Sequence, residues 1–184
     1  MLNKKENKAF EGIKANPYMQ KTIALVEDFV ENHTSKDNKI AYLAAFDEIF
    51  RILNEAKPFV DGETQKPDCD LVIYSLNKDE TLKKCMILSL KTSLRERAGQ
   101  TYKWKLLMEI ATSENPIKEK YNIDYNPEKM PLIGFATVNF YNEINNPQHR
   151  GMFKFFDKSF IAKNIDADFI SRLSTLPKYI NENL

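Results

Sequence analysis

Two short apolar segments separated by a polar turn constrain the fold of this chain more than any other feature. Residues 71–74 (Leu-Val-Ile-Tyr) and 85–90 (Cys-Met-Ile-Leu-Ser-Leu) are partly β-branched and too short for helices, which predicts two strands. The polar residues 77–80 between them favour an antiparallel hairpin. A capping box then begins at Ser93, with a glutamate three residues later, and predicts a helix that runs to about Thr112.

The segments on either side of the hairpin complete the predicted architecture. Apolar residues recur at steps of three and four over residues 18–32 and 40–53, which predicts two helices, the second closed by Pro58. The remaining predictions are a surface loop at 114–131, a third strand at 132–141, a loop at 145–151, a segment at 153–162 that fits helix or strand, and a short helix at 169–180 broken at Pro177.

These elements predict an α/β (α+β) fold: a small mixed sheet that contains the hairpin and is flanked by helices. With 184 residues, 42% of them hydrophobic, the chain can bury a core as one domain. We expect a helical N-terminal part at 1–60, a central part at 61–141 with the hairpin, the helix and the third strand, and a C-terminal part at 142–184.

Composition indicates where the protein works. The longest apolar runs are a few residues, and the first eight residues lead into no apolar stretch, so we expect no membrane contact and no secretory signal. Cys69 and Cys85 are the two cysteines, too few for a disulfide framework or a four-ligand zinc site. We therefore expect a cytoplasmic protein.

Charged residues at the ends of the two predicted strands suggest the chemistry. Asp68 and Asp70 stand at the head of the first strand and Lys91 at the end of the second, so a hairpin brings a carboxylate and an ammonium group to one sheet edge. The two aspartates point to the same side, and the sequence does not choose between them. Carboxylates bind Mg²⁺, a metal activates water for phosphodiester hydrolysis, and a lysine stabilises the charged transition state.

A strand-borne aspartate followed, after one hairpin, by a strand-borne lysine resembles the PD-(D/E)xK pattern of nucleases. Here the pattern is Pro-Asp at 67–68 and Ser-Leu-Lys at 89–91. Ser89 stands where the pattern has Asp or Glu, and serine is a poor metal ligand, so another carboxylate has to complete the site.

Residues 91–97 (Lys-Thr-Ser-Leu-Arg-Glu-Arg) are similar to the lysine and recognition-helix segment of type II restriction endonucleases of the EcoRII, SsoII and NgoMIV kind. That group also carries a small residue at the position of Ser89. The resemblance covers about residues 66–110. It implies a restriction-endonuclease-like core, a bacterial or archaeal source, and Mg²⁺-dependent cleavage of double-stranded DNA at a palindrome with adjacent G·C pairs, such as CCGG or CCNGG. Cutting both strands of a palindrome calls for a homodimer.

The resemblance also implies roles for single residues. Arg95 and Arg97 would donate to guanine O6 and N7, and Glu96 would accept from cytosine N4. In that group the missing acid comes from the helix after the lysine, where Glu109 is the acid available; Glu48, on the preceding predicted helix, is the other candidate. The remaining expected DNA contacts are Ser93, Gln100 (also a candidate to face the metal through a water), His149 and Arg150.

The net charge of +1 hides a basic segment. Residues 83–105 contain seven lysines and arginines against one acid, a local balance of +6, so the average charge does not argue against a DNA partner. Two rival hypotheses remain: a repair or resolvase-type nuclease of the same superfamily without strong sequence preference, and a degenerate DNA-binding module that does not cleave.

Overall fold

The computed structural model of the chain describes residues 17, 20, 24, 28, 39–43, 58–64, 69–79, 81–91, 95–127, 129–138, 143–165 and 167–184. Its strands are β1 (Lys39–Leu43), β2 (Phe59–Val60), β3 (Glu63–Thr64), β4 (Leu71–Leu76), β5 (Leu82–Lys91), β6 (Ile123–Asp124), β7 (Leu132–Thr137), β8 (Lys158–Ile161) and β9 (Ser171–Arg172). Its helices are α4 (Arg95–Thr112), α5 (Pro116–Lys120), η1 (Glu143–Asn145), α6 (Pro147–Phe153), η2 (Leu173–Thr175) and α7 (Leu176–Asn183).

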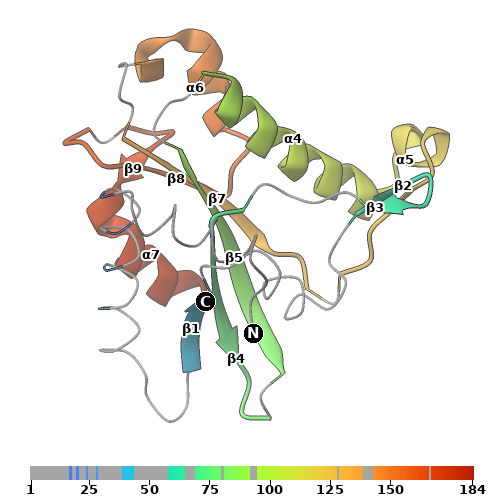
Figure 1. Cartoon of the computed structure of the whole chain (residues 1–184), viewed down its shortest axis with the longest axis horizontal. Helices are drawn as coiled ribbons and strands as arrows, with labels where there is room; N and C mark the ends of the chain where they lie inside the picture. The colour runs from blue at the N-terminus through green and yellow to red at the C-terminus, as the bar shows by residue number, and fades with distance from the viewer. Residues whose placement is uncertain are drawn as a thin grey trace.

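The main sheet is mixed, as predicted, with the strand order β1-β4-β5-β7-β8-β9 (Figure 1). β4 and β5 form the predicted antiparallel hairpin, in which Leu71 lies opposite Leu88. β5, β7, β8 and β9 are parallel to one another. The carboxyl ends of these four strands therefore meet at one edge of the sheet, where β5 ends at Lys91.

Helices cover both faces of this sheet because β5 alternates two sets of apolar side chains. Cys85 and Ile87 belong to a core cluster that includes Met108 and Ala111 of α4. The alternate residues of β5 belong to a second cluster together with residues of α7. From β5 these are Met86, Leu88 and Leu90, and from α7 they are Leu176 and Ile180. The flanking helices predicted from the sequence are thus confirmed. No helix in the described part of the chain is long and apolar enough to cross a membrane.

One predicted element in the first half needs correction. Residues 39–43 belong to strand β1, not to the helix predicted over 40–53, because they pair along β4 from Lys39 opposite Leu76 to Leu43 opposite Val72. Two apolar residues three positions apart, in a segment of only five residues, fit a helix as well as a strand. Residues 44–57 lie outside the described residues, and the described positions 20, 24 and 28 of the other predicted helix are helical.

The predicted surface loop at 114–131 contains regular structure. Asn115 begins α5 by accepting a hydrogen bond from the backbone N–H of Ile117 at 2.9 Å. β6 follows and pairs with β2, whose other neighbour is β3, in a small second sheet. β2 turns into β3 through Asp61 and Gly62, which both have positive φ, as a tight hairpin turn requires.

The C-terminal third also differs from the prediction. The expected loop at 145–151 contains η1 and α6, and Asn146 caps α6 with its side chain on the N–H of Gln148. The ambiguous segment 153–162 holds the end of α6 and the strand β8. Pro177 does not break a helix; it lies in the first turn of α7, where its missing N–H has no intrahelical partner to lose.

The predicted third strand is confirmed over Leu132–Thr137 as β7, and residues 139–141 of that prediction lie outside the described residues. The helix predicted to end near Thr112 is α4, which ends at that residue.

Candidate active site

The hairpin brings an acid and a lysine together at the sheet edge where β5 ends. Asp70 immediately precedes β4, and its backbone N–H donates to Leu88 O at 3.3 Å. Lys91 is the last residue of β5. Oδ2 of Asp70 lies 2.9 Å from Nζ of Lys91, and the two side chains are only 16% and 9% exposed. The acid–lysine juxtaposition expected from the sequence is therefore present for Asp70.

The backbone and a neighbouring hydroxyl hold the Asp70 carboxylate in place. Its Oδ2 accepts the backbone N–H of Leu90 at 2.8 Å, and the hydroxyl of Ser89 lies 3.5 Å away. Every hydrogen bond that the Asp70 carboxylate accepts from the described residues goes to Oδ2, so Oδ1 remains available to a cation. A hard divalent metal prefers an oxygen of this kind, so Asp70 fits as one metal ligand.

Ser89, at the position where an acid was expected, is buried and links the site to α4. Its hydroxyl lies 3.2 Å from the hydroxyl of Thr101, which is also buried. α4 begins at Arg95, four residues after Lys91, so its first turn follows closely on the acid–lysine pair. Arg95, Glu96 and Arg97 occupy that first turn, and their side chains lie outside the described part of the structure.

The structure does not bring Glu109 to this pair. Glu109 follows Thr101 by eight residues, which is about 12 Å along the helix axis, and its carboxylate lies 3.3 Å from Nζ of Lys105. Gln100 is exposed on α4. Among the described residues, no group of three or more His, Cys, Asp or Glu side chains could hold a metal. Asp68, Glu48 and Ser93 lie outside the described residues.

The sequence did not predict a partly buried ion pair that lies one helical turn after Thr101. Nζ of Lys105 lies 2.9 and 2.8 Å from the two carboxylate oxygens of Asp157, and the lysine side chain is 8% exposed. Oδ2 of Asp157 also accepts the N–H of Ile133 at the start of β7, at 2.7 Å. The available signal was a single lysine in an otherwise apolar half of the helix, because a lysine there has to find an acid.

His149 and Arg150 lie on α6 rather than in a loop. Nδ1 of His149 is 3.0 Å from the carbonyl oxygen of Glu143, and Arg150 is exposed. α6 lies beside the N-terminal end of α4 (Figure 1), and Phe155, two residues after α6, stacks on Tyr102 with ring centroids 5.4 Å apart. The described contacts do not join either residue to Asp70.

The cysteines do not supply a nucleophile to this site. Cys69 and Cys85 are both buried and free. Burial raises the pKa of Cys85 to about 12, so this thiol keeps its proton at neutral pH. Burial also raises the pKa of Tyr125, and the nearby Cys85 adds to the shift.

Comparisons with known proteins assign the chain to a family. A search of curated proteins found no match. A family model described as "BsaWI restriction endonuclease type 2" matches residues 49–179, well over half of the chain. The matched range includes β4, β5, α4 and the Asp70–Lys91 pair. The chain therefore belongs to the BsaWI family of type II restriction endonucleases, and it is a DNA-cleaving hydrolase.

Proposed function

We propose that this restriction endonuclease cuts both strands of a short palindrome with adjacent G·C pairs, with Mg²⁺ bound at Asp70 and with Lys91 assisting the attack. One observation carries the proposal: the Asp70 carboxylate and the Lys91 ammonium group lie 2.9 Å apart at the sheet edge from which α4 begins. The PD-(D/E)xK pattern and the resemblance to the EcoRII, SsoII and NgoMIV group support it.

Each group at the pair has a distinct role in hydrolysis. A bound Mg²⁺ supplies Lewis-acid stabilisation of the scissile phosphate and lowers the pKa of a water. Asp70 offers Oδ1 to that ion, while Leu90 N–H and Lys91 hold Oδ2. Lys91 orients the attacking water and stabilises negative charge on the phosphate. The Lys91 ammonium group needs no reorganisation to do so, because its hydrogen bond to Asp70 already holds it in position.

A second acid is expected to complete the metal site. We propose Asp68 or Glu48 for this role. Glu109 was the acid suggested by the resemblance, but it would have to leave Lys105, its partner at 3.3 Å, and reach about 12 Å along the helix from Thr101. Asp68 precedes Asp70 by two residues, a spacing that in an extended strand puts both side chains on the same side.

Sequence recognition is assigned to the first turns of α4. We propose that Arg95 and Arg97 bind guanines and Glu96 a cytosine, with Ser93 and Gln100 as further contacts. The exposed Arg150 and the neighbouring His149 would contact the DNA beside them. The working unit is a homodimer of single-domain chains, because one active site per chain cuts one strand.

Cleavage of mixed plasmid substrates with Mg²⁺ tests the proposal. Discrete fragments support site-specific cleavage. A smear would indicate a nuclease of the same superfamily without strong sequence preference, and binding without cutting would indicate a non-cleaving module. Lys91→Ala is expected to abolish cutting and leave DNA binding, whereas Lys78→Ala, an exposed lysine in the hairpin turn at the opposite sheet edge, is expected to cut normally. Retained cutting by Lys91→Ala would refute the mechanism.

The recognition role has its own test. Arg95→Ala or Arg97→Ala is expected to lower discrimination between the correct site and a site with one altered G·C pair by about 1–3 kcal/mol. The measurement is the ratio of cleavage rates on the two duplexes. An unchanged ratio for both variants would remove these arginines from base recognition.

A further inference from the structure

A second basic site lies at the same sheet edge as the acid–lysine pair. The strand register runs from Lys91 to Thr137, from Thr137 to Ile161, and from Ile161 to Arg172. Arg172 is therefore level with Lys91, three strands away, which is about 14 Å at a strand spacing of about 4.8 Å. Residues that pair in register on parallel strands project from the same face of the sheet, so Lys91 and Arg172 leave the sheet on one side.

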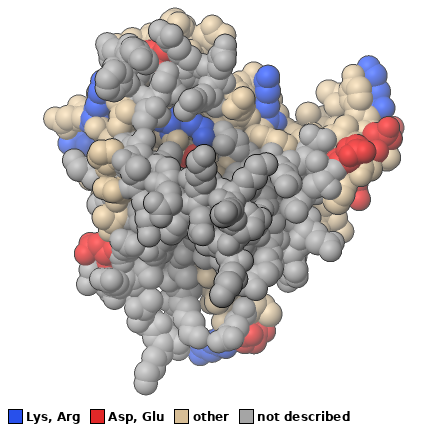
Figure 2. Space-filling model, viewed as in Figure 1, with Lys and Arg blue, Asp and Glu red and all other residues tan. Residues whose placement is uncertain are grey.

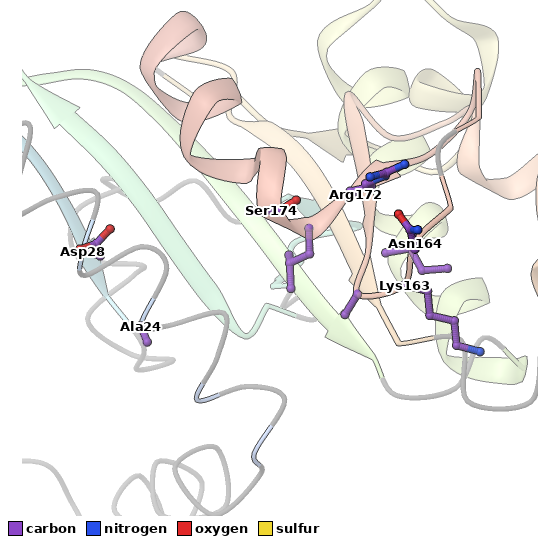
Figure 3. A pocket seen from close by; sticks show the side chains of 9 residues that line it. Ala24, Asp28, Lys163, Asn164, Arg172 and Ser174 are labelled. Carbon is purple, nitrogen blue, oxygen red and sulfur yellow. The ribbon is translucent and has the colours of Figure 1, made fainter.

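The surroundings of Arg172 form a cavity with polar groups at its rim. The cavity has a volume of about 700 Å³ and lies where β8 and β9 end. Lys163 and Asn164, just after β8, are exposed, as are Arg172 and Ser174. Figure 3 shows these four residues on one side of the cavity and Ala24 and Asp28 on the other. The cavity thus presents two cations, an amide and a hydroxyl from neighbouring segments.

The charge of this surface suits an anion. Figure 2 shows basic side chains over the upper left of the view, where β8 and β9 end. Arg172 and Lys163 line the cavity with one acid, Asp28, on the opposite wall. Guanidinium, ammonium, amide and hydroxyl groups are the side chains that most often hold DNA phosphates, and an arginine can bind a phosphate through two parallel hydrogen bonds.

We propose that Arg172, together with Lys163, binds a backbone phosphate of the DNA a few nucleotides from the scissile phosphate. The proposal rests on the proposed function, which places the scissile phosphate at Lys91. The roughly 14 Å between the two positions is several times the axial rise of about 3.4 Å per nucleotide of a strand, so the two phosphates are not adjacent. A contact at this position would orient the duplex along the sheet edge without reading its sequence, because phosphates carry no base information.

The salt dependence of binding provides the test. The DNA affinity of Arg172→Ala, Lys163→Ala and the double variant is measured between about 50 and 200 mM salt on a cognate and a non-cognate duplex. Each lost phosphate contact is expected to make the slope of log K against log salt shallower by about 0.9. The affinity loss should be equal on both duplexes. Lys78→Ala is the matched control, because it removes the same charge at the opposite edge of the sheet.

A second measurement locates the contact. Ethylation of a phosphate a few nucleotides from the cut is expected to weaken binding of the unaltered protein, and this interference should vanish with Arg172→Ala. An unchanged salt slope together with unchanged interference would overturn the proposal, as would an affinity loss confined to the cognate duplex. Failure of the proposed function would appear differently, as absence of cutting by the unaltered protein, and the salt slopes would still decide the phosphate contact.

Discussion

The two carboxylate oxygens of Asp70 differ in their contacts with the described residues. Its Oδ2 accepts hydrogen bonds from Lys91 Nζ and Leu90 N–H at 2.9 and 2.8 Å. Both are short, and they fix the carboxylate plane while Oδ1 remains available for a cation. A side chain held in this way needs no rearrangement before it acts, which is how preorganised groups stabilise a transition state.

Replacing Asp70 tests the roles proposed for its two carboxylate oxygens. Asp70→Asn keeps the size of the side chain and can still accept from Leu90 N–H, but it has no charge for Lys91 or a metal. We expect cleavage at saturating DNA to fall by about 100-fold or more, with the duplex still bound. Asp68→Asn, the same change two residues earlier, is the matched comparison. A larger loss for Asp68→Asn than for Asp70→Asn would contradict the assignment of Asp70 as the principal ligand.

The buried thiol of Cys85 makes stability depend on pH. Burial raises its pKa from the ordinary 9.0 to about 12, so above about pH 9 the unfolded chain loses a proton that the folded chain keeps. The free energy of unfolding therefore falls as the pH rises from about 9 to about 12, by at most about 1.4 kcal/mol per pH unit from this group. Cys85→Ala removes that contribution. Urea unfolding of both proteins at neutral and alkaline pH, under reducing conditions, measures it, and equal pH slopes would refute it.

At the scale of elements, α4 contacts both the hairpin strand β5 and the segment just before β8. Thr101 contacts Ser89 on β5 through the hydroxyls, and Lys105, one turn later on the same helix face, binds Asp157 before β8. Asp157 in turn accepts a hydrogen bond from the N–H of Ile133, the second residue of β7. These contacts hold α4 against the sheet, and Arg95 and Arg97 belong to the first turn of this helix.

Removal of Lys105 should loosen this arrangement. Lys105→Met fills a similar volume but leaves the partly buried Asp157 without its cation, and we expect a loss of about 3 kcal/mol in the free energy of unfolding. Lys103→Met, an exposed lysine on the same helix, should change stability by less than about 0.5 kcal/mol. Urea denaturation measures both. Equal stabilities of the two variants would show that the buried ion pair contributes little.

At the scale of the whole molecule, one sheet edge collects the functional groups. Four parallel strands end there, and β5 and β9 carry Lys91 and Arg172 to it. The last two residues hydrogen-bond to the hairpin strands. The hydroxyl of Ser75 donates to the backbone oxygen of Leu184 at 2.8 Å, and Nζ of Lys84 donates to the backbone oxygen of Asn183 at 2.9 Å. In the proposed homodimer, a second chain supplies the site for the other DNA strand.

Mixed dimers test this stoichiometry. When unaltered protein is co-expressed with differently tagged Lys91→Ala protein and the mixed species is isolated, we expect it to nick a plasmid and stop, because only one of its two sites works. The species should have a mass of about twice 21.4 kDa. Gel analysis of nicked and linear plasmid measures the outcome. Linear product formed in a single binding event would contradict one site per strand.

The local features of this chain were predictable from its sequence. The hairpin, the end of α4 at Thr112 and the approach of an aspartate (Asp68 or Asp70) to Lys91 follow from apolar runs, a polar turn and strand polarity, all of which act between residues close in sequence. The reason is that a hairpin register depends on the turn that joins its strands.

Only the tertiary structure decided the features that depend on distant partners. β1 is a strand because β4, more than two dozen residues away, offers it a free edge, and apolar spacing over five residues fits a helix equally well. Lys105 finds Asp157 52 residues away, and Arg172 comes level with Lys91 only through β7 and β8. Such contacts carry no signal in local propensity, because they form when strands far apart in the chain align and bury their side chains together.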